Sequence, residues 1–183
     1  YLGPNFHFVI YPINQNNNFN FISIIRKELI ESEISNRNLF NDKTFTNNLI
    51  SQISSKSNLN LIDIVKEIKC FPIFVSKKIS IPKSKNIFLT GDAFFSFSPS
   101  LAQGASQSIE AANDLFIHLK DNSSNYYKKR ILRTKQINSR SSINHFAFHL
   151  SNPLGVFFRN IFLRRMSKNK SFLGNYLGKI YNY

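Results

Sequence analysis

The stretch from Asn86 to Leu119 constrains the fold of this chain most, because its local pattern changes type within a few residues. The apolar run Asn86–Thr90, bounded by Gly91, predicts a buried strand. A Gly-Asp pair and a loop with one proline follow. Apolar residues then recur at the spacing of a helix that begins near Gly104, namely Ala105, Ile109, Ala112, Leu115 or Phe116, and Leu119. The sequence therefore predicts a strand, an acidic turn, a loop and a helix, in that order.

Small residues mark the beginning of this predicted helix. Gln103 is followed by Gly104, Ala105 and Ser106, whose side chains are too small to cover the backbone. The first N–H groups of a helix lack partners within the helix and carry the positive end of its dipole. A flat or anionic ligand could therefore approach the chain here.

The N-terminal part of the chain predicts both strands and helices. Aromatic and β-branched residues in Phe6–Tyr11 and Phe19–Ile25 predict two antiparallel strands, and Phe71–Val75 predicts a further strand. Between them, apolar residues at helical spacing predict two short helices, around 45–53 and 61–68.

The C-terminal part predicts helices alone. After a polar break at 122–125, helical spacing predicts a long helix over 126–150 and a shorter one from Pro153 to about Met166. A glycine-punctuated, aromatic tail follows from Lys168. The order of elements along the whole chain predicts an α/β or α+β fold and not an all-helical bundle.

Positive charge is concentrated in the C-terminal third. The formal net charge is +14, and the segment from Lys120 to Tyr183 holds thirteen Lys or Arg residues but only one acid, Asp121. Such a tail can meet nucleic acid, anionic lipid or an acidic partner, although a solvated helical face is the simpler interpretation. We expect no nucleic-acid partner, and we keep peripheral membrane contact through the tail as an option.

Composition also limits the compartment. The single cysteine, Cys70, allows no internal disulfide, which suits a reducing cytoplasm. No signal peptide is visible, and no apolar run reaches the roughly 18 residues that a spanning helix needs. We therefore expect a cytoplasmic protein, peripheral on a membrane at most. Because the chain begins with Tyr1 and its only methionine is Met166, we also expect a fragment of a longer protein.

The stretch from Gly91 to Leu115, GDAFFSFSPSLAQGASQSIEAANDL, resembles a motif of the FAD-dependent aromatic-ring monooxygenases. These are single-component flavoprotein hydroxylases, such as those acting on salicylate and on polyprenyl-methoxyphenol. Their second flavin-contacting motif reads G-D-A-A-H-x-x-x-P, followed by a Q-G pair and a helix that continues into E-D-A. The matching positions are Gly91, Asp92, Ala93, Pro99, Gln103, Gly104, Ile109 and Glu110. The G-P…H…Y-P pattern near the N-terminus and the tail around Tyr126–Arg133 also resemble this family, so the resemblance covers nearly the whole chain.

The resemblance assigns roles to individual residues. It implies that Asp92 accepts a hydrogen bond from a ribityl hydroxyl of FAD. It puts the backbone at Pro99 against the flavin ring and the substrate. It directs the N–H groups that begin the helix to the pyrimidine edge of the ring, where negative charge develops on reduction. The cofactor-binding residues that it implies are Gly91, Asp92, Pro99, Gly104, Ala105 and Ser106. Judged alone, Asp92 could also be an ordinary residue that caps the turn.

The resemblance also implies a fold and a reaction. The chain would be the C-terminal portion of an FAD/NAD(P)-binding Rossmann-like fold. Residues 1–82 would form part of an antiparallel substrate-domain sheet, 83–121 the segment that contacts FAD, and 122–183 a basic C-terminal helical region. The enzyme would reduce FAD with NADH or NADPH, capture O2 as a flavin hydroperoxide and hydroxylate an aromatic or conjugated ring. Phe8, Tyr11 and Phe74 are candidate walls of the substrate pocket, although such aromatics more often belong to a core.

The chain departs from the family pattern in two ways. The usual alanine-histidine pair is Phe94-Phe95, and Ala111 replaces the acid of E-D-A, which leaves the substrate class open. The G-x-G-x-x-G motif that holds the ADP part of FAD is absent from the sequence. Tight FAD binding should therefore need the N-terminal half of the enzyme, on the same or a separate polypeptide, unless the chain is a degenerate remnant.

Other groups of residues give only weak indications of a functional site. His145 and His149 are four residues apart on a predicted helix, but no third ligand supports a metal site, so we expect no metal. No sequence pattern indicates a catalytic nucleophile. The alternative function is a non-catalytic basic module that binds a membrane surface or a polyanion through Lys128–Arg140 and Arg159–Lys170.

Overall fold

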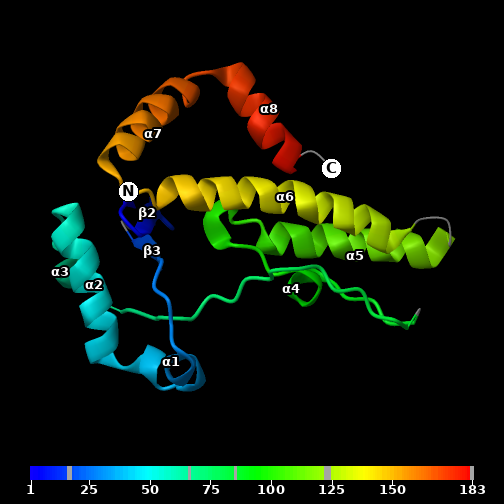
Figure 1. Cartoon of the computed structure of the whole chain (residues 1–183), viewed down its shortest axis with the longest axis horizontal. Coiled ribbons are helices and arrows are strands. Elements are labelled where there is room, and N and C mark those ends of the chain that lie inside the picture. Colours follow the sequence, from blue (N-terminus) through cyan, green and yellow to red (C-terminus); the bar gives the residue numbers. More distant parts are fainter. Residues whose placement is uncertain (16–17, 66, 85, 122–124, 182–183) are drawn as a thin grey trace. The chain divides into compact units, whose positions relative to one another are not determined.

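The chain has a mixed α+β fold in which a three-stranded antiparallel sheet at the N-terminus is followed mostly by helices (Figure 1). This computed structural model describes residues 1–15, 18–65, 67–84, 86–121 and 125–181. Within these residues the chain forms two compact units, one made of residues 1–72 and 146–181 and the other of residues 73–145. Most of the polar break expected at 122–125 lies outside the described residues, and the domain boundaries expected near residues 82 and 121 stay a prediction.

The predicted N-terminal hairpin is confirmed. Strands β2 (Phe6–Pro12) and β3 (Phe19–Ile25) pair in antiparallel register, with Phe6 opposite Ile25 and Pro12 opposite Phe19. The short strand β1 (Leu2–Gly3) pairs with the other edge of β2. Because side chains alternate along a strand, Phe6 and Phe8 share one face of the sheet. Both rings are buried there, against helical side chains that belong to the same unit.

Helix α2 (Lys43–Ser57) supplies the other side of this core. The Asp42 carboxylate accepts a hydrogen bond from the N–H of Phe45 at 2.8 Å, which is the bond expected of an N-cap aspartate. Ile50 and Ile53 of α2 are buried in contact with the sheet. The helix ends at Asn58, whose φ of 56° lies in the left-handed region that asparagine tolerates better than most residues.

The connections around α2 are short helical turns. Helix α1 (Glu31–Ser35) and the 3-10 turn η1 (Leu39–Asn41) precede it, and α3 (Leu61–Ile64) follows it. The helix predicted around 61–68 is shorter than expected, because α3 ends at Ile64 and Val65 already has extended backbone angles. Leu61 is fully buried and completes the apolar core of this unit.

Two predicted strands, Phe71–Val75 and Asn86–Thr90, are wrong: neither segment pairs with a strand in the described chain. Backbone polar groups of an extended segment need partners, and side chains provide some of them here. The Tyr126 hydroxyl donates to the carbonyl of Leu89 at 2.7 Å, and the Tyr127 hydroxyl accepts from its N–H at 3.2 Å. Two tyrosines of one helix therefore form hydrogen bonds with backbone groups that a neighbouring strand would otherwise have bonded.

The helices of the second unit follow in close succession. A short helix, α4 (Gly91–Phe94), and a 3-10 turn, η2 (Pro99–Leu101), lead to the predicted helix α5 (Gly104–Asp121). The long helix α6 (Tyr126–Phe148) is also confirmed. It begins in the second unit, and its last residues, from Phe146, belong to the first.

Two helices end the described chain. Helix α7 (Pro153–Met166) has the predicted bounds and is capped by Asn152, whose side-chain oxygen accepts from the N–H groups of Leu154 and Gly155. The glycine-punctuated, aromatic tail forms a further helix, α8 (Lys170–Tyr181). Among the described residues no helix combines the length and the apolar character needed to cross a bilayer.

Candidate functional site

The Gly-Asp turn at the start of α4 lies directly on the first turns of α5. Gly91 has a φ of 55°, and a Cβ built on it would lie 2.7 Å from the hydroxyl oxygen of Ser108. That hydroxyl donates to the carbonyl of Gly104 at 3.0 Å. A residue with a side chain would be strained here by both its backbone conformation and this contact. The structure therefore brings two predicted cofactor-binding positions, Gly91 and Gly104, to one place.

Asp92 follows within the first turn of α4, and its side chain is exposed. No described residue donates a hydrogen bond to its carboxylate. The N-cap residue of α4, Thr90, likewise makes no side-chain cap bond. An aspartate in a turn is most often explained by capping, and that explanation does not apply to Asp92.

The N-terminus of α5 is open. The first backbone hydrogen bond of the helix joins the N–H of Gln107 to the carbonyl of Gln103 at 2.9 Å. The N–H groups of Gly104, Ala105 and Ser106 have no acceptor among the described residues. Ala105 and Ser106 are exposed, and nothing lies within 4 Å of a Cβ built on Gly104. The first turn carries no acidic side chain, so three amides and the positive dipole end are available to an electron-rich group.

The loop between the two helices is anchored to α6 by a cluster of hydroxyls and one imidazole. Pro99 is half-buried and begins the turn η2. The hydroxyls of Ser98 and Ser100 lie 3.0 Å apart, and each is 3.4 Å from Nδ1 of His145. The Ser141 hydroxyl donates to the carbonyl of Ser98 at 2.8 Å. This cluster was not predicted from the sequence, although Ser141 and His145 have the four-residue spacing of one helix face.

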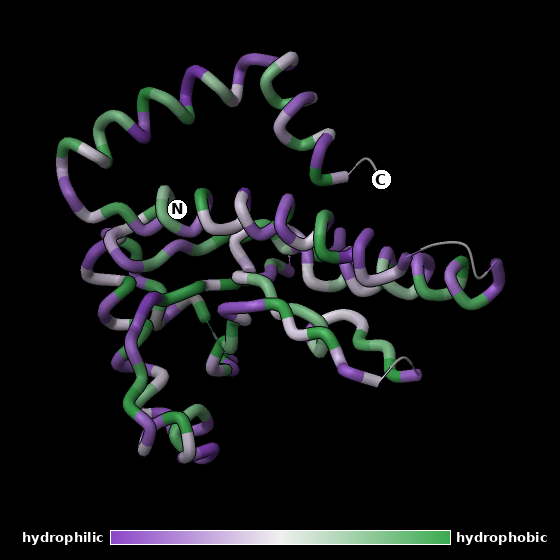
Figure 2. Tube along the Cα trace, turned by 45° about the vertical axis from the view of Figure 1, so that its right-hand side comes forward, coloured by the Kyte–Doolittle hydropathy of each residue, from purple (hydrophilic) through white to green (hydrophobic). Residues whose placement is uncertain are grey.

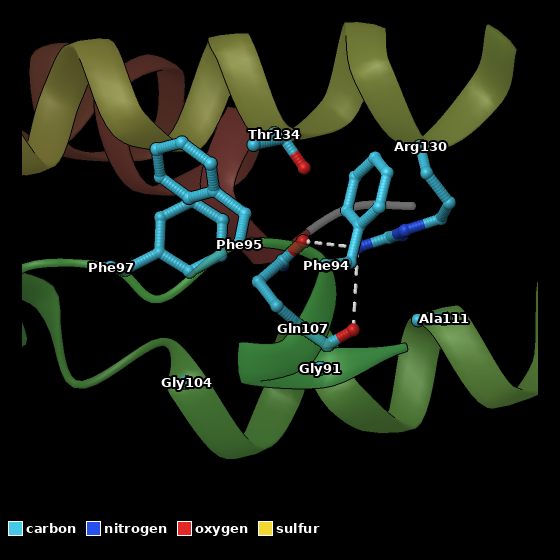
Figure 3. Close-up of a pocket in the computed structure, with 9 residues that line it drawn as sticks. All are labelled: Gly91, Phe94, Phe95, Phe97, Gly104, Gln107, Ala111, Arg130 and Thr134. Carbon is cyan, nitrogen blue, oxygen red and sulfur yellow. Dashed lines mark hydrogen bonds between the residues drawn. The ribbon is translucent and has the colours of Figure 1, made fainter. Parts of the chain in front are cut away.

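A buried ionic network joins α5 to α6 behind this loop. Arg130 is 2% exposed, and its Nη1 atom lies 3.2 Å from a carboxylate oxygen of Asp114, which is also buried. Its Nη2 atom donates to the side-chain oxygen of Gln107 at 2.9 Å and to the carbonyl of the same residue (Figure 3). Beside this pair, Arg133 Nε donates to Glu110 at 2.8 Å. The network fixes α5 against α6, and so fixes the orientation of the open N-terminus of α5.

The charge state of Glu110 is set by its neighbours. Burial alone would raise the pKa of Glu110, but hydrogen bonding to Arg133, the nearby charges of Arg133 and Arg130, and a hydrogen bond from Gln107 lower the pKa below its ordinary value. Glu110 therefore remains ionised in mildly acidic solution, and its attraction to both guanidinium groups is lost only when the pH falls through that lowered pKa.

A small cavity lies within this part of the unit (Figure 3). Its volume is about 10 Å³, which is roughly the space of one water molecule. It is lined by Gly91, Phe94, Phe95, Phe97, Gly104, Gln107, Ala111, Arg130 and Thr134. A flavin ring or an aromatic substrate could not enter a space of this size. Phe94 and Phe95 are buried beside it, and Phe97 is half-buried. A ligand of that size could bind only outside this cavity.

The three candidate pocket walls have different surroundings. Phe8 is 4% exposed and belongs to the apolar core of the first unit. Tyr11, on the same strand, is exposed, and its hydroxyl accepts from the side-chain amide of Asn20 at 2.7 Å. Phe74 belongs to the second unit and is 64% exposed. The structure does not bring these residues together within one unit, and their role stays a prediction.

His7, His145 and His149 each lie within hydrogen-bonding distance of another side chain. His149 does not share a site with His145, because the Nε2 atom of His149 lies 3.0 Å from Nδ1 of His7, and both of these residues belong to the first unit. Both rings of that pair are buried. In the part of the chain that the structure describes, no three His, Cys, Asp or Glu side chains come together in a way that could hold a metal ion.

Comparison with protein-family models, curated proteins and solved structures finds no match for this chain. A function must therefore be argued from the residues themselves. Three features support a functional site. They are the open N-terminus of α5, the exposed Asp92 that caps no helix, and the contact of Gly91 with α5.

Proposed function

We propose that this chain is the C-terminal half of an FAD-dependent aromatic-ring monooxygenase that uses NADH or NADPH as reductant. The observation that carries the proposal is the Gly91–Asp92 turn held against the N-terminus of α5. Asp92 follows Gly91 with an exposed carboxylate that has no capping role, and α5 begins with three amides without acceptors among the described residues. This is the donor and acceptor set that the motif resemblance requires for the ribityl chain and the pyrimidine edge of a flavin.

Each residue of the set has a defined task in this proposal. Asp92 accepts a hydrogen bond from a ribityl hydroxyl, and its negative charge strengthens that bond. The N–H groups of Gly104, Ala105 and Ser106 stabilise negative charge on the pyrimidine edge, aided by the helix dipole. The backbone at Pro99 would lie beside the ring, next to Ser98, whose carbonyl accepts a hydrogen bond from Ser141. When bound, FAD supplies the activation of O2 and the hydroxylation of an aromatic or conjugated ring.

The proposed fold is the C-terminal portion of an FAD/NAD(P)-binding Rossmann-like fold, completed by an N-terminal half. The sequence has no G-x-G-x-x-G turn for the ADP part of FAD, so other residues must bind that part. An exposed face of α5 supports this view, since Ile109, Phe116 and Leu119 are each more than 60% exposed. Large apolar side chains on one helix face usually pack against another part of a protein.

The test is the visible spectrum of the gene product expressed with everything encoded upstream of Tyr1. We expect flavin bands near about 370 and 450 nm, followed by NAD(P)H oxidation when aromatic substrates are added. A folded, colourless protein that FAD cannot reconstitute would overturn the proposal.

A pair of variants then tests the site itself. Asp92→Asn should weaken FAD retention about 10-fold or more, because a hydrogen bond to a charged acceptor contributes roughly 1.5–3 kcal/mol. Since no described residue bonds to the Asp92 carboxylate, the fold should be unaffected. Asp121→Asn, at the exposed far end of α5, is the matched control and should retain FAD as the wild type does. Equal retention by both variants would exclude Asp92 from the cofactor site.

A further inference from the structure

Helix α7 presents an apolar face that its own unit does not cover. The face consists of Leu154, Phe157, Phe158, Ile161 and Phe162, which follow the i, i+3, i+4, i+7, i+8 spacing of one helix stripe. Their exposed fractions range from 48% to 70%. The opposite side of α7 is the one that packs, because Val156 and Leu163 are half-buried there and Arg159 is buried. Figure 2 shows the hydrophobic positions of α7 alternating with hydrophilic ones along the helix.

A cluster of positive charges lies at the C-terminal end of this face. Arg164, Arg165, Lys168 and Lys170 are all exposed, and none of them forms an ion pair with a described carboxylate. The sequence has no acidic residue after Asp121, so no side chain close to them in sequence can neutralise their charge. We refer to these four residues as the basic cluster.

Four other basic residues of the tail have contacts within the fold. Arg130 and Arg133 are buried and paired with Asp114 and Glu110, and Lys129 lies 2.7 Å from Asp114. Arg159 is buried, and it donates to the carbonyl of Ala147 and to the Asn160 side chain. The structure thus separates the basic tail into a part that stabilises the fold and a part that faces outward beside exposed phenylalanines.

We propose that α7 docks on an anionic lipid surface, with its five apolar side chains inserted at the level of the headgroups and the basic cluster in contact with anionic lipids. A helix with aromatic and aliphatic residues on one face and Lys or Arg beside it is typical of helices that lie in a membrane interface. The occupant is an anionic lipid surface because the apolar face ends beside the basic cluster, and this combination matches acyl chains that lie below anionic headgroups. This inference is independent of the flavin site and does not rest on it.

The charge dependence is tested with sedimentation of vesicles. The wild-type chain should bind vesicles of phosphatidylcholine with about 30% phosphatidylglycerol and should bind pure phosphatidylcholine much more weakly. Changing the basic cluster to glutamine, as Arg164→Gln, Arg165→Gln, Lys168→Gln and Lys170→Gln, should lower binding at least about 10-fold. A control with the same loss of charge at exposed lysines, Lys43→Gln, Lys56→Gln, Lys77→Gln and Lys78→Gln, should stay within about twofold of the wild type.

The insertion of the apolar face is tested separately. Phe157→Gln together with Phe158→Gln should lower vesicle binding about 10-fold or more, since each exposed ring is removed from the lipid. Phe116→Gln with Leu119→Gln, on the exposed face of α5, is the matched control and should bind as the wild type does. Circular dichroism of every variant should match the wild type, because all four positions are exposed.

Three results would overturn the proposal. The first is a wild-type chain that does not sediment with anionic vesicles. The second is unchanged binding by the variants of α7 and the basic cluster. The third is a wild-type chain that is dimeric by light scattering and becomes monomeric on substitution of Phe157 and Phe158, which would assign this face to a second copy of the chain.

Discussion

The interiors of the two units are stabilised by different kinds of interaction. The first unit has an apolar core in which Phe6 and Phe8 of the sheet pack against Ile50, Ile53 and Leu61. In the second unit the interface between α5 and α6 buries an arginine, an aspartate and a glutamine, and the apolar stripe of α5 faces outward. The first arrangement gains free energy from removing apolar surface from water, whereas the second depends on exact pairing of charges that are costly to bury.

The largest expected effect is in the charged interface. Arg130→Met would leave the buried Asp114 carboxylate without its guanidinium, with only Lys129 still near it. We expect the free energy of unfolding, measured by urea denaturation, to fall by about 3–5 kcal/mol. Lys129→Met is the control, because that lysine side chain is 48% exposed and should contribute less than about 1 kcal/mol. Similar small losses in both variants would mean that the interface is held mainly by its apolar contacts.

The apolar core should respond less sharply to a single truncation. Ile53 is 1% exposed, and Ile53→Ala removes buried methyl groups and leaves a cavity that the neighbouring rings can fill only in part. The expected loss is about 2–4 kcal/mol. Ile109→Ala, at a position of α5 that is 72% exposed, should change stability by less than about 0.5 kcal/mol. An equally large loss for Ile109→Ala would contradict the outward orientation of the apolar stripe.

The glycines that begin α4 and α5 offer a further comparison. Gly91→Ala should cost about 1–2 kcal/mol, because alanine is strained at a φ of 55°. The contact at 2.7 Å from Ser108 adds to that strain. Gly104→Ala has open space around the new methyl group and no positive φ, so it should be neutral or slightly stabilising. Thermal unfolding of the two variants measures the difference, and equal midpoints would exclude a special role for the conformation of Gly91.

Local patterns predicted the elements that are stabilised locally. The hairpin, the helix over Phe45–Ile53 and the helices beginning at Gly104, Tyr126 and Pro153 all follow from spacing, caps and turn residues. The strands expected at 71–75 and 86–90 were wrong because a strand needs a partner, and a short apolar run does not say whether one exists. The described chain meets part of that need with tyrosine side chains.

The candidate site was predicted only in part, because local patterns in the sequence identify only features that lie within one continuous stretch. Gly91, Asp92 and the residues that begin α5 belong to one continuous stretch, so their motif could be seen in the sequence. The partners of Arg130 lie 16 or more residues away in the sequence, on another helix. Nothing in the sequence distinguishes Arg130 from the other basic residues of the tail. The face that α5 buries could not be deduced from apolar spacing either, because here the buried face is the polar one.

The weakest effect that we expect concerns Tyr126, whose hydroxyl holds the extended segment at Leu89. Burial raises the pKa of Tyr126 to about 12, from an ordinary value of about 10. The folded state therefore favours the protonated phenol, so its contribution to stability is complete below about pH 10 and is lost as the pH rises through about 12. Tyr126→Phe should cost about 1 kcal/mol at neutral pH through the lost hydrogen bond. It should also flatten the decline in unfolding free energy across this alkaline range. If wild type and variant lose stability in parallel above pH 10, other groups are responsible, and the tyrosine contact would be weaker than its 2.7 Å distance suggests.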